Sequence, residues 1–399
     1  MALFIILMVV IIINDVEREV LFLDTALFID LLNKNNINFF TGVPDSLLKP
    51  LCDYLTKTYG IDSGHHLIAH NEGGCVAFAS GYHLATGKVP CVYMQNSGIG
   101  NMTNPVVSLT HPKVYAIPIL YVIGWRGEPG VKDEPQHVFQ GEIMLRQLES
   151  MEIETFVVDK HTTEQELYEK LNHYKMLFEL GKSAAFIVRK GAFIADYSKE
   201  YKNRYILNRE TVIKIITEYS CDDMIVSTTG KISRELYEIR ANSGGNHSRD
   251  FLTVGSMGHS AMIALGIAVN KKKSRVWCID GDGALLMHMG ALSVVGNIKP
   301  ENFIHVILNN ESHETVGGMP TVISTTDVCA MAIALGYKTA YSVDNETELT
   351  KVLEKVKTDN GPALIEVKVA LGARADLGRP ILKAVDNKSN FMKFLGEQK

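Results

Sequence analysis

Short apolar runs alternate with longer segments of helical spacing along the first half of the chain. The runs lie at residues 39–40, 92–93, 119–123 and 185–188. Short runs rich in apolar and β-branched residues are typical of buried strands, whereas apolar positions three or four residues apart are typical of amphipathic helices. Strands that alternate with helices predict a doubly wound α/β domain with a parallel sheet.

The same alternation returns after a polar segment at residues 197–208. Strands are expected at residues 224–227, 276–279, 303–308 and 363–367. The pattern therefore predicts an α/β chain of two doubly wound, parallel-sheet domains, at residues 21–190 and 209–385. The tail, residues 387–399, is polar, and we expect it to lie at the periphery.

The most informative segment is residues 276–312, which joins a buried strand, a Gly-Asp-Gly turn, a helix and a second strand that ends in Asn309 and Asn310. Ligands of parallel sheets gather at the carboxyl ends of the strands, so we expect Asp282 and Asn310 to be neighbours. A carboxylate oxygen and an amide oxygen suit Mg²⁺, which completes its octahedron with phosphate and water. A lone Gly-Asp-Gly is more often an ordinary tight turn, but the paired asparagines favour a site for a metal and a diphosphate.

The glycines beside Asp282 support that interpretation. Gly281 and Gly283 would permit unusual backbone angles and a close approach of a diphosphate. The helix expected to begin near Ala284 would turn amide groups and the positive end of its dipole toward the anion. Upstream, the Gly-Ser-Met-Gly string at residues 255–258 has small residues that would let a ligand approach the backbone.

In the first half of the chain, Glu72 is the candidate for catalysis. It follows a short apolar run and precedes a helix, which predicts a buried carboxyl group with a raised pKa at the end of a strand. The alternative from the sequence alone is a charge at a helix N-terminus, favoured by the helix dipole. The site expected in the second half makes a catalytic role the better interpretation.

Together these motifs resemble those of the thiamine diphosphate enzymes. The resemblance implies a Mg²⁺ ion bound by Asp282, Asn310 and the backbone carbonyl of Ser312. It implies that Glu72 hydrogen-bonds the cofactor's pyrimidine ring and activates the cofactor, and that Met257 wedges under the two rings. The alternative for Met257 is a core methionine in a glycine-rich turn. The other cofactor contacts implied by the resemblance are Thr229, Gly230, Gly255, Ser256, Gly281 and Gly283.

Strings at residues 41–46, 95–101, 125–137 and 309–318 narrow the resemblance to the phosphonopyruvate decarboxylases, with the sulfopyruvate decarboxylases as close relatives. The middle domain of the longer pyruvate decarboxylase-like enzymes is missing. The resemblance implies decarboxylation of 3-phosphonopyruvate to phosphonoacetaldehyde and CO₂, with sulfopyruvate or another acidic 2-oxo acid as the alternative substrate. It also implies a homodimer or larger assembly with its sites between chains.

Polar residues in these strings are candidates for proton transfer and substrate binding. His137, with Gln136, and His313 are the candidates for proton transfer, because a histidine exchanges protons near neutral pH. The alternative is that either histidine is a structural hydrogen-bonding residue. The candidates for substrate binding are Asn96, Ser97, Asn101 and Arg126. Arg126 could pair with a dianionic phosphonate, although a lone arginine is more often a surface charge.

Composition argues against several other classes. The 399 residues are 46% hydrophobic and carry a net charge of −5, which argues against nucleic-acid binding. The six cysteines have no Cys-x-x-Cys spacing, so we expect reduced thiols in a cytoplasmic protein, without disulfides or zinc. The apolar segment at residues 2–13 is too short to span a bilayer, and no membrane partner is expected.

Two rival classes have their own sequence requirements. A dinucleotide-dependent dehydrogenase would need a Gly-x-Gly-x-x-Gly string after its first strand, and the sequence has no such fingerprint there. A non-catalytic regulatory protein on the same fold would be expected to lack Glu72, Asp282 or Asn310, and all three are present. The sequence therefore favours an enzyme.

Overall fold

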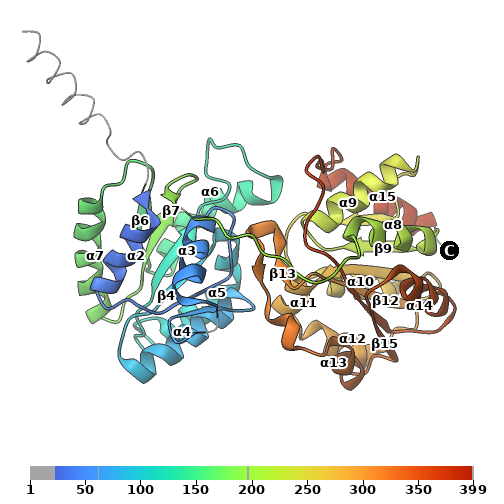
Figure 1. The fold of residues 1–399 in the computed structure, drawn as a ribbon, viewed down its shortest axis with the longest axis horizontal. Helices are drawn as coiled ribbons and strands as arrows, with labels where there is room; N and C mark the ends of the chain where they lie inside the picture. The colour runs from blue at the N-terminus through green and yellow to red at the C-terminus, as the bar shows by residue number, and fades with distance from the viewer. Residues whose placement is uncertain (1–22, 62, 196, 398–399) are drawn as a thin grey trace, which may run out of the picture. The chain divides into compact units, whose positions relative to one another are not determined.

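The computed structural model describes residues 23–61, 63–195 and 197–397, and the chain forms two compact units that divide between Lys199 and Glu200 (Figure 1). Each unit is built on a six-stranded sheet, and all neighbouring strands in it pair in parallel. This arrangement confirms the predicted fold class. The apolar segment 2–13 and the predicted domain start at residue 21 lie outside the described residues.

The first unit has the strand order β3-β2-β4-β5-β7-β6. Its strands β5 and β7 are buried along their whole length, as expected for a parallel sheet covered by helices. Helix α4 packs against α5 and strands β2 and β4, whereas α2 packs against α3 and α7. The elements are β1 (Leu23–Asp24), α2 (Thr25–Lys34), β2 (Phe40–Gly42), α3 (Lys49–Tyr59), β3 (His66–Ile68), α4 (Glu72–Thr86), β4 (Cys91–Gln95), the 3-10 turn η1 (Asn96–Gly98), α5 (Ile99–Pro105), η2 (Val106–Thr110), β5 (Leu120–Gly124), α6 (Pro135–Ser150), β6 (Glu154–Val158), α7 (Glu164–Glu179), β7 (Ala184–Val188) and β8 (Phe193–Ile194).

The second unit has the strand order β10-β9-β11-β12-β16-β15. Successive side chains of a strand point to opposite faces, so Trp277 packs with α8, α9 and α14 while Cys278 packs with α10 and α12. The elements are α8 (Arg209–Ser220), β9 (Met224–Ser227), α9 (Lys231–Asn242), β10 (Asp250–Leu252), α10 (Ser260–Asn270), β11 (Val276–Gly281), α11 (Asp282–Met287), α12 (Ala291–Ile298), β12 (Phe303–Asn309), β13 (Ser312–His313), η3 (Glu314–Val316), β14 (Met319–Pro320), η4 (Val322–Thr325), α13 (Val328–Ala334), β15 (Thr339–Val343), α14 (Glu346–Thr358), β16 (Ala363–Lys368) and α15 (Ala384–Glu397).

Residues 384–397 of the polar C-terminal tail form the helix α15, which packs at the edge strand β10 and buries only two side chains, those of Asn387 and Phe391. The Asn387 side chain is buried, donates a hydrogen bond to the carbonyl of Asp250 (2.8 Å) and accepts one from the amide of Leu252 (3.0 Å). The Phe391 ring packs against Phe251, with centroids 5.7 Å apart. The helix is held at the edge strand β10 by few apolar residues, too few to give a clear hydrophobic period in the sequence.

The later part of the polar segment between the units is attached to the second unit. Asn203 Nδ2 donates to the carbonyls of Asn310 and Val369, both at 2.9 Å. The Tyr205 hydroxyl donates to Glu311 Oε1 at 2.5 Å. Residues 200–208 contain no helix or strand, yet these bonds fix them to the loops that follow β12 and β16.

All six cysteines are free thiols, and Cys52, Cys75, Cys91 and Cys278 are buried. Burial raises the pKa of each of these four thiols above its usual range, so they are protonated and inert at neutral pH. Within the described part of the chain, no helix combines the length and the apolarity that crossing a membrane requires.

Candidate active site

Asp282 is the first residue of α11, immediately after strand β11. Its side chain is buried, and Oδ2 accepts a hydrogen bond from the Thr321 hydroxyl at 2.6 Å. Burial raises the pKa of the carboxyl group to about 7, against the opposing effect of Thr321 and backbone amides. A divalent cation at this carboxylate would offset the cost of burying its charge.

Asn310 follows strand β12, which pairs directly with β11. Its Nδ2 donates to Glu314 Oε2 at 2.7 Å, and its Oδ1 accepts from the backbone amide of Ser312 at 3.1 Å. The preceding Asn309 is instead fully buried, and its Nδ2 donates to Glu366 Oε1 on strand β16 at 2.7 Å. The two asparagines therefore have different roles, and Asn309 holds strands β12 and β16 together.

Gly283 lies where Met257 and His313 meet. A β-carbon on Gly283 would stand 3.2 Å from both Met257 Cε and His313 Nδ1, so a side chain there would compete for their space. Burial lowers the pKa of His313 to about 4, which leaves its imidazole neutral at physiological pH. The structure thus brings together one predicted cofactor contact, one turn residue and one candidate for proton transfer.

The glycines of the turn do not use the unusual backbone angles that the sequence suggested. Gly281 is extended, with φ −113° and ψ 160°, and Gly283 lies inside α11. Their contribution is the absence of a side chain rather than a left-handed conformation. Left-handed backbone occurs in the flanking loops, at Gly230 (φ 91°) and Ser256 (φ 55°).

Those flanking loops carry the remaining predicted cofactor contacts. The Thr229 hydroxyl donates to the carbonyl of Val254 at 2.7 Å, which ties the loop after β9 to the 255–258 string. Gly255 follows in that string, and the Ser256 hydroxyl lies 3.2 Å from His259 Nδ1. The two loops are therefore joined at the carboxyl edge of the sheet.

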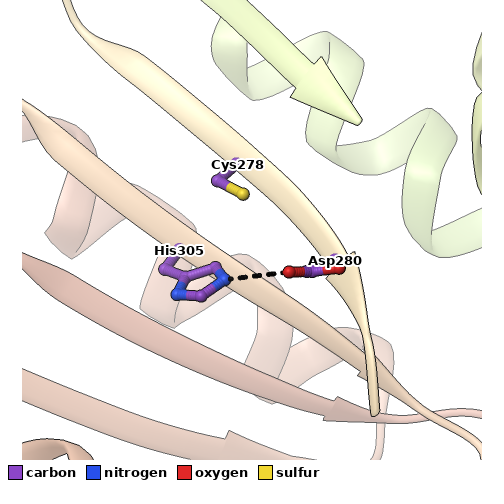
Figure 2. A group of neighbouring side chains, drawn as sticks. All are labelled: Cys278, Asp280 and His305. Carbon is purple, nitrogen blue, oxygen red and sulfur yellow. Dashed lines mark ion pairs between the residues drawn. The ribbon is translucent and has the colours of Figure 1, made fainter. Parts of the chain in front are cut away.

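A buried group of three side chains lies on β11 and β12, beneath the turn (Figure 2). Cys278, Asp280 and His305 have candidate ligand atoms within 4.8 Å of one another. His305 Nδ1 is hydrogen-bonded to the Tyr337 hydroxyl at 3.1 Å, and Asp280 Oδ1 accepts from the amide of Gly281 at 3.0 Å. We interpret the group as support for the Gly-Asp-Gly turn, since Asp280 anchors its first amide.

The residues of this half fit a magnesium diphosphate. The donor set consists of hard oxygen atoms, which are the ligands that Mg²⁺ prefers. The Asp282 carboxylate, the Asn310 amide oxygen and the Ser312 backbone carbonyl, the ligands that the sequence predicted, are all oxygen groups. The buried hydroxyl of Ser312 also has no hydrogen-bond partner among the described residues. Gly283 adds no side chain beside these groups, where a β-carbon would already meet Met257 Cε and His313 Nδ1 at 3.2 Å.

In the first unit, Glu72 begins α4 and is buried. Its Oε2 accepts a hydrogen bond from Asn101 Nδ2 at 2.7 Å. Burial raises the pKa of the carboxyl group, and the hydrogen bond from Asn101 partly opposes that rise. A β-carbon on Gly98 would stand 2.5 Å from Glu72 Oε1, so the turn η1 closes over the carboxyl group. Ser97, in the same turn, is half-buried.

Arg126 forms a bidentate ion pair with Asp133. Its Nε donates to Asp133 Oδ2 at 2.8 Å, its Nη2 donates to Asp133 Oδ1, and its Nη1 donates to the Ser46 hydroxyl at 3.0 Å. Asn96 holds the same residue by its backbone, donating to the Arg126 carbonyl (2.8 Å) and accepting from the Arg126 amide (3.2 Å). The structure thus places Asn96 beside Arg126, whereas Asn101 is hydrogen-bonded to Glu72.

Gln136 and His137 lie in the first turn of α6 and are both half-buried. Burial, followed by the nearby charge of Arg126, lowers the pKa of His137. A β-carbon on Gly127 would overlap the His137 carbonyl, so the start of this helix packs directly on the Arg126 loop. His137 is therefore neutral at physiological pH and lies close to Arg126.

The sequence did not single out Asp45, which lies in the loop after β2 and is fully buried. Burial raises the pKa of its carboxyl group to about 6, although Arg126 and backbone amides oppose the rise. A β-carbon on Gly124, at the end of β5, would overlap this carboxylate. The sequence does contain a signal for Asp45: it is the acidic residue of the Gly-Val-Pro-Asp string at residues 42–45, at the end of strand β2.

Two family models match the chain. The thiamine pyrophosphate enzyme N-terminal TPP binding domain matches residues 25–153, and the C-terminal TPP binding domain matches residues 228–367. Thiamine pyrophosphate is another name for thiamine diphosphate. The fold and the two models place the chain in the class of thiamine pyrophosphate enzymes, without a middle domain.

Three curated relatives refine that class. Phosphonopyruvate decarboxylase of Streptomyces viridochromogenes is 32% identical, over 89% of this chain and 90% of its own. Sulfopyruvate decarboxylase subunit beta of Methanococcus maripaludis is 32% identical over 41% of this chain and 84% of its own, and subunit alpha is 35% identical over 31% and 69%. The chain belongs to the phosphonopyruvate decarboxylase family of thiamine pyrophosphate-dependent decarboxylases. It is accordingly an enzyme, a carboxy-lyase, rather than a regulatory protein on the same fold.

Proposed function

We propose that this protein decarboxylates 3-phosphonopyruvate to phosphonoacetaldehyde and CO₂, with thiamine diphosphate and Mg²⁺. The observation that carries the proposal is a set of buried polar groups that follow three strands: Glu72 after β3 in the first unit, and Asp282 and Asn310 after β11 and β12 in the second. The near full-length similarity to phosphonopyruvate decarboxylase supports the choice of substrate. Sulfopyruvate or another acidic 2-oxo acid is the alternative.

The cofactor and metal would be held by residues of both units. When bound, thiamine diphosphate supplies the electron sink that decarboxylation of a 2-oxo acid needs. Asp282, Asn310 and the backbone carbonyl of Ser312 would bind Mg²⁺, and Met257 would support the rings. Glu72 would hold and exchange a proton at the pyrimidine ring, and its burial favours the protonated form. The diphosphate side would contact Thr229, Gly230, Gly255, Ser256, Gly281 and Gly283.

His137 and His313 would take part in proton transfer as neutral imidazoles. Burial lowers the pKa of both, so each is a neutral imidazole that can accept a proton through its free ring nitrogen and return that proton from the imidazolium form. Gln136, Asn96, Ser97 and Asn101 would orient the substrate through hydrogen bonds. Asn101 already holds Glu72, which gives it a second role in positioning that carboxyl group.

Arg126 would recognise the acidic head of the substrate. Asp133 keeps two of its nitrogens in a fixed plane, which leaves Nη1, now bonded to Ser46, as the atom for which a phosphonate oxygen would compete. A guanidinium fixed in this way loses little conformational entropy on binding an anion. We therefore expect the charge of the substrate head to determine much of the affinity.

The two domains, proposed at residues 21–190 and 209–385, would bind the pyrimidine and the metal diphosphate respectively. We propose a cytoplasmic homodimer or larger assembly in which each site forms between chains. Relatives that are named as separate subunits support an assembled enzyme.

A substrate panel with purified protein tests the proposal. We expect kcat/KM to fall in the order phosphonopyruvate, sulfopyruvate, pyruvate, because the first carries the most charge for charge-assisted hydrogen bonds. Arg126→Ala should reduce the first value much more than the last, whereas Arg146→Ala, an exposed arginine on α6, should change neither. Equal or better turnover of sulfopyruvate would replace the proposed substrate.

Removal of metal and cofactor tests the rest. Protein treated with chelator and dialysed should be inactive, and should recover only when thiamine diphosphate and Mg²⁺ are both returned. Asp282→Ala should not recover, because the ion loses its carboxylate ligand. Recovery with thiamine diphosphate alone, in protein shown to be free of divalent metal, would contradict the Mg²⁺ assignment.

A further inference from the structure

Glu314 begins the turn η3, four residues after Asn310, and its side chain is only 10% exposed. Its carboxylate oxygens accept hydrogen bonds from several directions. Oε2 accepts from Asn310 Nδ2 (2.7 Å) and from Arg209 Nη1. Oε1 accepts from Lys231 Nζ (2.8 Å) and from the backbone amide of Gly372 (3.1 Å). One carboxylate therefore contacts a candidate metal ligand, two cations and the backbone of another loop.

These partners come from separate loops at the carboxyl edge of the sheet. Lys231 begins α9 directly after Gly230, Asn310 follows β12, and Gly372 follows β16. These are the loops that carry or flank the proposed metal and diphosphate contacts. The Glu314 side chain contacts all three of these loops.

The surrounding charges are balanced. Arg209, 4% exposed, also binds Glu235 through two hydrogen bonds of 2.8 Å and 2.7 Å. The two cations, Arg209 and Lys231, are thus matched by the two carboxylates of Glu235 and Glu314. Removing one carboxylate would leave an unpaired positive charge beside the diphosphate loop.

The contacts of Asn310 determine which way its amide points. An amide group has a donor side and an acceptor side. Nδ2 faces the Glu314 carboxylate, which accepts, and Oδ1 faces the backbone N–H of Ser312, which donates. Oxygen is the atom of this side chain that can bind Mg²⁺, so its orientation matters for the metal.

We propose that Glu314 is a positioning residue for the metal site: it orients the Asn310 amide and neutralises the cations beside the diphosphate loop. The inference rests on the proposed function, because it concerns the Mg²⁺ and the diphosphate assigned there. The two roles can be separated, since one depends on an acceptor atom at the right distance and the other on charge. A residue that only stabilised the fold would change neither metal affinity nor anion affinity selectively.

Two substitutions separate orientation from charge. Glu314→Gln keeps an oxygen that can accept from Asn310 but removes the charge. Glu314→Asp keeps the charge, but its side chain is one methylene shorter and draws the acceptor away from Asn310. Glu314→Ala removes both, and Glu301→Ala, an exposed glutamate of the same unit, is the control.

The test measures Mn²⁺ binding to the full-length protein by electron paramagnetic resonance with saturating thiamine diphosphate, and pyrophosphate binding without metal by calorimetry. Outer-shell partners of metal ligands typically contribute about 10- to 100-fold to metal affinity. Glu314→Ala and Glu314→Asp should therefore weaken Mn²⁺ binding by about 10- to 100-fold, whereas Glu314→Gln should stay closer to wild type. Glu314→Gln should bind pyrophosphate more tightly than wild type, Glu314→Asp about as wild type does, and Glu301→Ala should change neither affinity.

The inference would be overturned if Glu314→Ala bound Mn²⁺ with an affinity within twofold of wild type. It would also be overturned if Glu314→Asp bound Mn²⁺ more tightly than Glu314→Gln does. If Glu314→Ala does not fold, the order of the Gln and Asp variants still decides. Wild-type protein that binds neither Mn²⁺ nor thiamine diphosphate would instead refute the proposed function.

Discussion

Three buried carboxyl groups, Glu72, Asp45 and Asp282, show how neighbouring atoms distinguish residues of similar chemistry. Burial raises the pKa of all three. Asp282 faces the Thr321 hydroxyl beside other oxygen donors, which suits a metal, whereas Glu72 is enclosed by Asn101 and Gly98. For Asp45, the positive charge of Arg126 opposes the rise in pKa that burial causes. We infer that Asp282 acts ionised with a metal bound, whereas Glu72 acts by exchanging a proton.

Replacement of Glu72 by glutamine should separate binding from catalysis. Glu72→Gln is nearly isosteric and should bind thiamine diphosphate within a few-fold of wild type, measured by fluorescence quenching. Its kcat should fall by about 10²- to 10⁴-fold, because an amide cannot exchange the proton that a carboxyl group can. Turnover near that of the wild type would show that Glu72 is structural.

Asp45 should make the stability of the protein depend on pH. Its pKa rises from 3.8 to about 6 on folding, so the folded state binds the proton more tightly. The stabilisation from that proton is complete below about pH 4 and is lost as the pH rises through about 6. Relative to wild type, Asp45→Asn should therefore gain roughly 3 kcal/mol in unfolding free energy between pH 4 and pH 7.

Urea unfolding of metal-free protein at several pH values measures this difference. Asp386→Asn, an exposed carboxylate on α15, is the control. A constant difference between Asp45→Asn and wild type across that range would contradict the raised pKa of Asp45.

Whole elements were predictable from the sequence where their burial was complete. The runs at 276–279 and 303–308 became β11 and β12, and Asp282 and Asn310 follow these strands, as the Gly-Asp-Gly and Asn-Asn patterns indicated. The edge strands β6 and β15 were not predicted, because most of their residues are only partly buried and lack a continuous apolar run. The crossover after β11 is broken into α11 and α12 rather than one helix.

The partners of the site residues could not be predicted. Glu72 meets Gly98 and Asn101, and Asn310 meets Glu314, through the conformations of turns that carry no hydrophobic period. The pairing of Arg126 with Asp133 likewise depends on how a glycine-rich loop folds back. Sequence pattern locates strand ends, whereas loop geometry decides which side chains touch.

The turn η1 provides a test of such a partner. Gly98→Ala should displace the Glu72 carboxyl group, because the new methyl group would overlap it. We expect a loss of at least about tenfold in kcat and about 1–3 kcal/mol in unfolding free energy, as for other overpacked sites. Gly100→Ala, two residues further on, meets no atom within 4 Å and should be close to neutral. Equal activity of the two variants would contradict the packing of Gly98 on Glu72.

Neither of the two units carries the complete set of proposed site residues. Glu72 lies before Lys199, and Asp282 and Asn310 lie after Glu200. If each site forms between chains, as proposed, the activity would need an assembly. In that arrangement, two defective chains can complement each other.

Mixing Glu72→Gln with Asp282→Ala should restore part of the activity that each has lost. Under conditions of subunit exchange, a mixed dimer would contain one site with both intact residues, so activity should approach about a quarter of the wild-type value if exchange is random. The measurement is specific activity against mixing ratio, with each variant alone as control. No recovery despite exchange seen by mass spectrometry, or a fully active monomer by light scattering, would contradict shared sites.

The hydrogen bonds of Asn203 and Tyr205 make the connecting segment asymmetric, because they attach it to the second unit. If the two units were produced as separate polypeptides, the position of the break would therefore matter. A break before Glu200 would leave the segment with the loops after β12 and β16. A break after residue 206 would deprive those loops of their tie, at the place where Asn310 should meet the metal.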